Sequence, residues 1–450
     1  MGNFNNLMSP LKIGPVELKN RYVVAPMNET FAGVRGEATA QYIAYFAARA
    51  KGGFGLLTTG AIMGTKLASK FVWGRNPYMF SPLHIQGMSL FNETCHHFGA
   101  QTAAQMTIGF GRQGHSDNHH ELVPAATGGL PYEIAIEKGA HPLVAPSMKT
   151  NDLAREFLYG QNTFEMSIDL IHSEQKEFAQ SCQLAIKSGF DVIDIHAPHG
   201  YLEHQFLSPL SNKRTDMYGG SWRNRKRFLI EIAEQVRYAA GKDVAVGCRI
   251  SAEEHCEGGL TREEMIDVAQ DLQALGCDYI SLSDGGGYEE SGHLIPDPER
   301  WAHQPDCAAE FKKALKIPAI LVGAHDPVLA ESIVAEGKAD LIALGRQSFC
   351  DPELPNKVAA GKIEDIIKCK RCNICLARAN GDMGGPRCPF NPMLGREFEF
   401  PEYHMGPRRP DEPLFPRGAM SMPSLNHAWW RSEIPYTEKF WIPFRGPGSR

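Results

Sequence analysis

The stretch from Val244 to Ser283 decides the fold. It reads VAVGCRI (Val244–Ile250), then TREEMIDVAQDLQAL (Thr261–Leu275), then YISLS (Tyr279–Ser283). The outer pieces are short apolar runs, which predict buried strands. The middle piece has helical periodicity, and Thr261 with Glu264 gives a capping-box signature where the helix should begin. The stretch therefore predicts a strand–helix–strand unit with parallel strands.

The same alternation of an apolar run and a helical pattern occurs eight times along the chain. Strands that are each followed by a helix favour a parallel sheet, because parallel neighbours need a crossover connection. Eight units predict a (β/α)8 TIM barrel of class α/β, with a doubly wound open sheet as the alternative. We expect strands at Tyr22–Ala25, Gly55–Thr59, Thr102–Met106, Val192–Ile195, Val244–Ile250, Tyr279–Ser283, Ala319–Val322 and Leu341–Leu344, and helices at Ala38–Lys51, Leu83–Phe98, Ile168–Ser188, Arg223–Ala240, Arg262–Leu275, Pro305–Leu315, Pro327–Glu336 and Pro352–Ala360.

Composition excludes several classes of protein. The net charge of -6 implies no surface for a polyanion, so we expect no nucleic-acid partner. No apolar run reaches the length of a membrane span, and the first residues do not resemble a secretion signal. Seven of the 11 cysteines are scattered without a disulfide framework, which favours a reducing, cytoplasmic location.

The other four cysteines lie in one short stretch, in which Cys369, Cys372 and Cys375 form a C-x2-C-x2-C run and Cys388 follows after twelve intervening residues. Four thiolates at this spacing suit an iron–sulfur cluster or a zinc ion. The tight run is more typical of bacterial cluster-binding runs than of zinc ribbons, where two pairs stand far apart. A closed zinc site remains the alternative on spacing alone.

Chemistry in a TIM barrel lies at the carboxyl ends of the strands. His196 and His199 are three residues apart where a predicted strand becomes a loop, so both can point at one oxygen atom. Tyr201 follows with a phenol that can give a proton. Gln105 can pair with a flat ring that carries adjacent donors and acceptors. Further candidate binding positions after the strands are Pro26, Met27, Asn28, Gly60, Arg249, Gly323, Gly345 and Arg346, of which the last three lie where barrels commonly hold a phosphate.

Six motifs, taken in order along the chain, resemble the iron–sulfur branch of the old yellow enzyme family. That branch includes 2,4-dienoyl-CoA reductase, 2-enoate reductase and trimethylamine dehydrogenase. The resemblance covers about Leu7 to Glu397. Its motifs are NRYVVAPM (Asn20–Met27), QMTIGFGR (Gln105–Arg112), DIHAPHGYL (Asp194–Leu202), NKRTDMYGGS (Asn212–Ser221), GRQSFCDP (Gly345–Pro352) and the cysteine run with its trailing NPMLGRE (Asn391–Glu397).

The resemblance implies two cofactors and a substrate site. Non-covalent FMN would lie in the barrel beside Pro26, Met27, Asn28 and Gly60. Gln105 and Arg249 would contact its ring, and Gly323, Gly345 and Arg346 its phosphate. A [4Fe–4S] cluster would lie on Cys369, Cys372, Cys375 and Cys388. His196 and His199 match the pair that holds a substrate oxygen, and Tyr201 matches the proton-donating tyrosine.

The expected activity is reduction of an activated C=C bond of the enoate, enone or enoyl type. The alternatives are an amine dehydrogenase or N-demethylase that passes electrons out through the cluster, or a non-catalytic electron-transfer subunit. Nothing after Glu397 reads GxGxxG, so we expect the nucleotide-binding domains of the larger relatives to be lacking. Electrons would then come from a separate ferredoxin or flavoprotein, through the cluster to FMN.

Three parts of the chain are expected. Residues 1–365 form the FMN-binding barrel, with a cap insertion near 109–161. Residues 366–397 form the iron–sulfur segment. Residues 398–450 form an irregular C-terminal extension, which either wraps over its own barrel or docks a partner in a homo- or hetero-oligomer.

Overall fold

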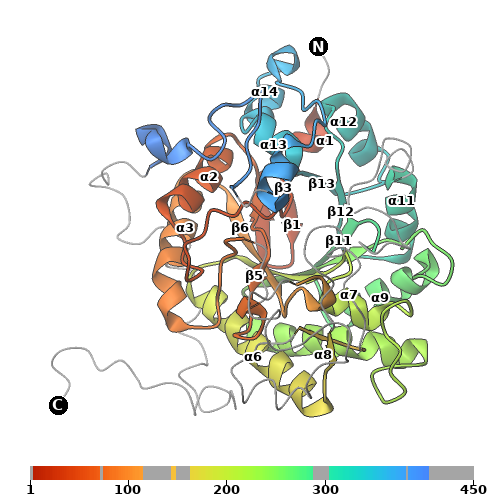
Figure 1. The fold of residues 1–450 in the computed structure, drawn as a ribbon. Helices are drawn as coiled ribbons and strands as arrows, with labels where there is room; N and C mark the ends of the chain where they lie inside the picture. Colours follow the sequence, from red (N-terminus) through yellow and green to blue (C-terminus); the bar gives the residue numbers. More distant parts are fainter. Residues whose placement is uncertain are drawn as a thin grey trace.

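A closed barrel of parallel strands forms the centre of the molecule (Figure 1). The computed structural model describes residues 4–70, 74–114, 143–147, 163–286, 304–381 and 384–404. Within them, β4 pairs with both β3 and β6, which joins the two ends of the sheet. The barrel prediction is therefore confirmed, and the open-sheet alternative is excluded. The barrel strands are β3 (Tyr22–Val24), β4 (Leu56–Thr58), β6 (Gln101–Thr107), β9 (Val192–Ala197), β10 (Ala245–Ser251), β11 (Tyr279–Ser283), β12 (Ala319–Val322) and β13 (Leu341–Leu344).

Helices surround this barrel, as the alternating pattern predicts (Figure 1). Thr261 and Glu264 form the predicted capping box at the start of α9. The long helices place apolar faces on the strands, so the core is one continuous layer between strands and helices. The outer helices are α2 (Ala40–Lys51), α3 (Ile85–His97), α6 (Ile168–Lys187), α8 (Trp222–Ala240), α9 (Arg262–Ala274), α11 (Gln304–Ala314), α12 (Pro327–Ala335) and α14 (Leu354–Ala359).

A buried polar contact fixes three strands inside the barrel. Asp194 on β9 accepts hydrogen bonds from Gln105 Nε2 on β6 and from the Tyr279 hydroxyl on β11, both at 2.7 Å. The Tyr279 ring passes over Gly247, where a Cβ atom would lie 2.0 Å from the ring. Gly247 is therefore required for this contact.

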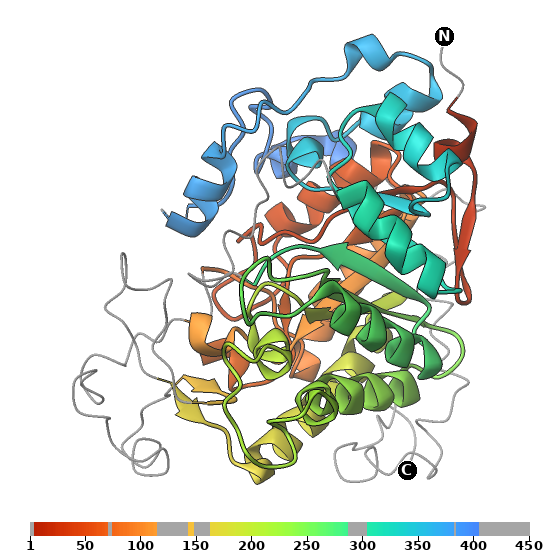
Figure 2. The ribbon, with the colours of Figure 1, turned by 90° about the vertical axis from the view of Figure 1, so that its right-hand side faces the viewer.

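The amino-terminal end of the barrel is closed by a hairpin of β1 (Leu11–Ile13) and β2 (Val16–Leu18), which the strand pattern did not predict. Ile13, Val16 and Leu18 are buried with the side chains that fill this end of the barrel. Figure 2 shows the hairpin (red) at one end of the molecule and the cysteine segment (blue) at the other. The hairpin thus leaves the opposite, carboxyl end of the strands for the site.

Shorter elements complete the described chain. In the predicted cap near 109–161 the structure describes residues 109–114 and 143–147, and the rest of that insertion lies outside the described residues, as does most of the predicted 398–450 extension. No helix in the described ranges combines the length and the apolar character that crossing a membrane requires. The shorter helices and strands are α1 (Asn5–Met8), β5 (Ile62–Met63), β7 (Val144–Ala145), β8 (Phe164–Glu165), α7 (Leu202–Leu207), α13 (Arg346–Cys350) and α15 (Ile374–Leu376).

Candidate active site

Three predicted catalytic residues meet at the end of β9. The ring centroids of His196 and His199 are 5.5 Å apart, and those of His196 and Tyr201 are 5.2 Å apart. His199 and Gly200 have φ angles of 66° and 68°, so the chain turns sharply between strand and helix α7. This turn brings side chains three and five residues apart to one place.

His196 is buried and both of its ring nitrogens lack a hydrogen-bond partner within the described part of the chain. Burial, and then the nearby Arg249 guanidinium, hold the pKa of His196 well below its ordinary value. The imidazole is therefore neutral, with one N–H to donate and one nitrogen to accept. A buried polar ring without a partner costs free energy, so it indicates a place for a bound polar group.

His199 belongs to a short chain of hydrogen bonds. Arg249 Nη2 donates to Ser283 Oγ at 3.2 Å, and Ser283 Oγ lies 2.5 Å from His199 Nε2. Burial and then Arg249 lower the pKa of His199, so its ring is neutral as well. In one of the two tautomers open to the ring, Ser283 accepts from Arg249 and donates its hydroxyl proton to His199 Nε2. His199 Nδ1 then carries the proton that can be donated to another atom.

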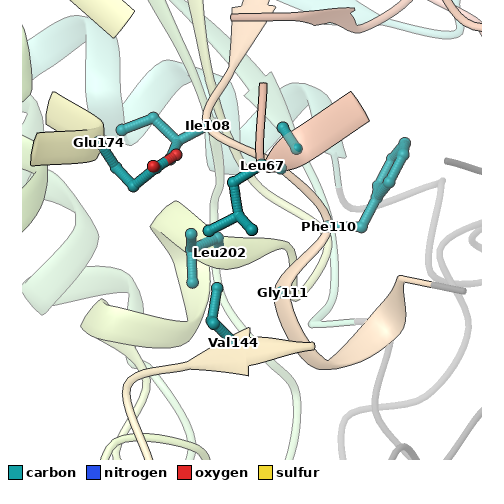
Figure 3. Close-up of a pocket in the computed structure, with 9 residues that line it drawn as sticks. Leu67, Ile108, Phe110, Gly111, Val144, Glu174 and Leu202 are labelled. Carbon is teal, nitrogen blue, oxygen red and sulfur yellow. The ribbon is translucent and has the colours of Figure 1, made fainter. Parts of the chain in front are cut away.

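Tyr201 lies partly exposed at this place and packs edge-on against Phe110, with ring centroids 4.8 Å apart. Burial raises the pKa of Tyr201 to about 12, so the phenol stays protonated at neutral pH. Phe110 also lines a small apolar cavity with Leu67 and Leu202, into which Glu174 reaches from α6 (Figure 3). Tyr201 therefore stands between the two histidines and an apolar wall.

The predicted cofactor residues at β3, β4, β6 and β10 lie close together. Arg249 Nη1 is 3.4 Å from the Pro26 carbonyl oxygen, and Arg249 Nε is buried without a partner among the described residues. A Cβ atom at Gly60 would lie 2.2 Å from the Met27 carbonyl oxygen, so the loops after β3 and β4 touch. The buried Arg249 Nε–H is therefore available to donate a hydrogen bond to an acceptor atom of a bound ring. Gln105 gives its amide nitrogen to the barrel contact, which leaves its carbonyl oxygen for such a ring.

Asn28 and the predicted phosphate residues complete the mouth. Asn28 Oδ1 accepts a hydrogen bond from Asn76 Nδ2 at 3.3 Å. Gly323 follows β12 with a φ angle of 111°, and Gly345 follows β13, where a Cβ atom would lie 3.0 Å from Met27 Sδ, a tight contact. Arg346 Nη1 donates to Asn373 Oδ1 at 2.5 Å, so it faces the cysteine segment.

The four cysteines of the predicted cluster are placed unequally. Cys375 is buried, Cys369 and Cys388 are partly buried, and Cys372 is exposed. Burial, and then the neighbouring Cys369, raise the pKa of the Cys375 thiol to about 11. Within the described residues, no three side chains of His, Cys, Asp or Glu lie close enough together to ligate a single metal ion. Four thiols are a donor set that an iron–sulfur cluster or a zinc ion can use.

Short contacts fasten the cysteine segment to the barrel. Gln347 on α13 accepts from the Cys369 backbone N–H at 2.9 Å and donates to the Ile367 carbonyl oxygen at 2.9 Å. Arg49 on α2 forms a buried ion pair of 2.9 Å with Glu397. These two tethers fasten one end of the segment to α13 and the other end to α2.

Sequence reasoning missed several residues that build this site. Ser283 ends a correctly predicted strand, so its position alone could have placed it at the mouth. Gln347 directly follows Arg346, but nothing in the sequence indicates its partner. Glu397 is the last residue of the predicted iron–sulfur segment, and its burial requires a cation that only the folded chain brings close.

A parallel barrel that carries an arginine with a buried, unpartnered Nε and a tyrosine–histidine cluster at the carboxyl ends of its strands fits an oxidoreductase barrel that binds a flavin. Residues 6–365 match the NADH:flavin oxidoreductase / NADH oxidase family, so the chain belongs to that family of FMN-dependent oxidoreductases and the resemblance to old yellow enzymes is confirmed.

Relatives with known names support this assignment. The chain is 34% identical over 416 residues to NADH oxidase of Thermoanaerobacter brockii (90% of this chain, 59% of the relative). It is 32% identical over 415 residues to cinnamate reductase of Clostridium sporogenes (88% and 58%). A solved 2-naphthoyl-CoA reductase superposes with a TM-score of 0.78 at 29% identity (88% and 58%). N,N-dimethylglycine/sarcosine dehydrogenase of Chromohalobacter salexigens is 28% identical over 403 residues (88% and 54%). The chain thus spans less than two thirds of the length of each of these relatives.

Proposed function

We propose that the protein reduces the C=C bond of an α,β-unsaturated carbonyl or carboxyl compound. The observation that carries this proposal is His196, a buried neutral imidazole without a partner, next to His199 and Tyr201. A substrate oxygen bound between the two rings would receive their hydrogen bonds. Such donors stabilise the negative charge that develops on this oxygen during reduction.

The three side chains have separate roles in this proposal. His196 and His199 each donate one N–H to the substrate oxygen, and Ser283 keeps the His199 proton on Nδ1. Tyr201 gives its proton to the α-carbon, because its raised pKa keeps it protonated until that step. Phe110 and the apolar cavity behind it exclude water from that carbon.

The cofactor residues are assigned in the same proposal. Arg249 and the carbonyl oxygen of Gln105 would contact the FMN ring, Pro26, Met27, Asn28 and Gly60 would line its place, and Gly323, Gly345 and Arg346 would contact its phosphate. Bound FMN supplies hydride transfer and one-electron exchange. Cys369, Cys372, Cys375 and Cys388 would hold a [4Fe–4S] cluster.

We further propose that a separate ferredoxin or flavoprotein supplies the electrons. None of the 11 cysteines forms a disulfide in the structure, which supports a reducing, cytoplasmic environment. The names of two relatives, cinnamate reductase and 2-naphthoyl-CoA reductase, support an unsaturated acid or thioester as the substrate.

A second candidate function is oxidation of a methylated amine. It is favoured by the dimethylglycine/sarcosine dehydrogenase relative and by the aromatic ring of Phe110 at the site, since a cationic substrate prefers aromatic walls. Two donor imidazoles suit an oxyanion better than a cation, so reduction is the first choice.

Anaerobic spectroscopy of the flavin separates the two functions. Prereduced protein mixed with cinnamate or an enone should regain the absorbance of oxidised flavin. Oxidised protein mixed with dimethylglycine or dimethylamine should stay oxidised. Bleaching by the amine, without a response to any unsaturated acid, ketone or thioester, would replace the first function with the second.

A further inference from the structure

The loop between the first and third cysteines of the segment lies over the carboxyl end of β12. Arg371 Nη2 lies 3.2 Å from His325 Nε2. His325 comes two residues after Gly323, which directly follows this strand. One side chain of the cysteine segment therefore reaches a strand end at which a phosphate is expected.

The same loop also meets the end of β13. Asn373 Oδ1 accepts the hydrogen bond from Arg346, the residue that follows Gly345. Arg371 and Asn373 have φ angles of 54° and 58°, which residues other than glycine adopt uncommonly. This backbone bends the loop so that both side chains turn toward the barrel, and such conformations cluster at ligand sites.

In the described part of the chain, the charged groups that lower the pKa of His325 are both positive. Burial, and then Arg371 and Arg346, lower the pKa of His325 to about 4, so its ring is neutral and accepts from Arg371. Asp326 is the acid next in the chain, but its carboxylate accepts from the backbone at the start of α12 and lies 3.8 Å from Lys368. Two guanidinium groups that both act on one neutral ring repel each other, and an anion between them removes this repulsion.

We propose that Arg371 is a phosphate-binding residue for FMN, acting beside Arg346, with His325 as the residue that positions it. A guanidinium is suited to this task because its planar fork can bind two phosphate oxygens at once. This inference rests on the FMN site of the proposed function. It means that the loop carrying the cluster cysteines also closes the flavin site, so that one segment contributes to both cofactors.

The test compares two flavins that differ only in the phosphate. Flavin is removed from the full-length protein, and rebinding of FMN and of riboflavin is measured by quenching of flavin fluorescence. Arg371→Gln should raise the Kd for FMN about ten- to a hundredfold, the value of one charge-assisted hydrogen bond, and leave the Kd for riboflavin unchanged. His325→Gln should raise the Kd for FMN by a smaller factor, again without affecting riboflavin.

Matched controls come from the same loop. Lys370→Gln removes an exposed charge next in the chain and should change neither Kd. Arg371→Lys keeps the positive charge but lacks the planar fork of the guanidinium. Its Kd for FMN should therefore lie between those of wild type and Arg371→Gln. An unchanged FMN affinity in Arg371→Gln, or equal losses for FMN and riboflavin, would overturn the inference. Wild-type protein that binds neither flavin would contradict the proposed function itself.

Discussion

The two sides of the barrel mouth are built in opposite ways. On the side of β9 to β11, His196 is buried and His199 is partly buried, and both are neutral and held on a strand or at a strand end. On the side of β12 and β13, a loop with an exposed Cys372 is fastened by a few contacts such as the Gln347–Cys369 hydrogen bond. Packing within the barrel holds the histidine side in place, whereas a few hydrogen bonds and ion pairs hold the cysteine loop against the barrel.

The difference between the two sides indicates what a bound ligand would supply to each of them. The histidine side has its donors in position and lacks only an acceptor, as the unpartnered nitrogens of His196 indicate. The cysteine side has its donor atoms in one segment, but they do not converge on one point in the described residues. Metal binding can supply the free energy that completes such a site.

The largest expected effect lies on the cysteine side. Cys375→Ser removes the one buried thiol of the segment, and a hydroxyl is a poor ligand for iron. We expect loss of nearly all bound iron and of the brown colour in anaerobically purified protein. Cys256→Ser, which lies outside the segment, is the control and should keep both the bound iron and the brown colour. Full iron content in Cys375→Ser would refute the assignment of this side.

The next effect lies on the histidine side. Tyr201→Phe removes only the phenolic oxygen and should slow substrate reduction about 100-fold or more, as loss of a general acid does. Reduction of the flavin by dithionite should proceed at the wild-type rate. Stopped-flow absorbance resolves the two half-reactions. If both rates were equal to those of wild type, Tyr201 would not be the acid.

A smaller effect tests the tethers. Glu397→Gln leaves the Arg49 guanidinium buried without its counter-charge, and we expect a loss of about 3 kcal/mol in the free energy of unfolding. Glu399→Gln breaks the exposed pair with Arg396 and is the matched control, with little or no expected change. Urea unfolding measures both variants. Equal stability of the two would mean that the buried pair does not fasten the segment.

The smallest effect is an expected absence of pH dependence. Tyr201 acts as an acid while it is protonated, and this form is lost only as the pH rises through about 12. Both histidines have lowered pKa values and stay neutral above pH 7. The kcat/KM for the unsaturated substrate should therefore be flat from pH 7 to about 9.5. A descending limb near pH 8 that disappears in Tyr201→Phe would show a different pKa for this residue.

The comparison also shows what the sequence could predict. The strands are short apolar runs, so local pattern was sufficient to place all eight of them and, with the strand ends, the cluster of His196, His199 and Tyr201. The β1–β2 hairpin was missed because its three-residue strands carry too few residues for a periodic signal.

Contacts between distant residues could not be predicted in the same way. Arg49 and Glu397 are 348 residues apart, and their pairing depends on how the segment returns to α2. Arg371 stands between cysteines in a stretch that predicts metal binding, so only the folded loop shows that it faces β12. Local pattern determines strand and helix positions, whereas the path of loops across the barrel end is a property of tertiary packing.

The central claim is that one chain combines a flavin barrel with an iron–sulfur cluster. Quantification of FMN, iron and acid-labile sulfide in protein purified without oxygen tests it most directly. We predict one FMN and about four iron and four sulfide per chain, with a brown colour that dithionite bleaches. Zinc in place of iron, or colourless protein without flavin, would contradict this account.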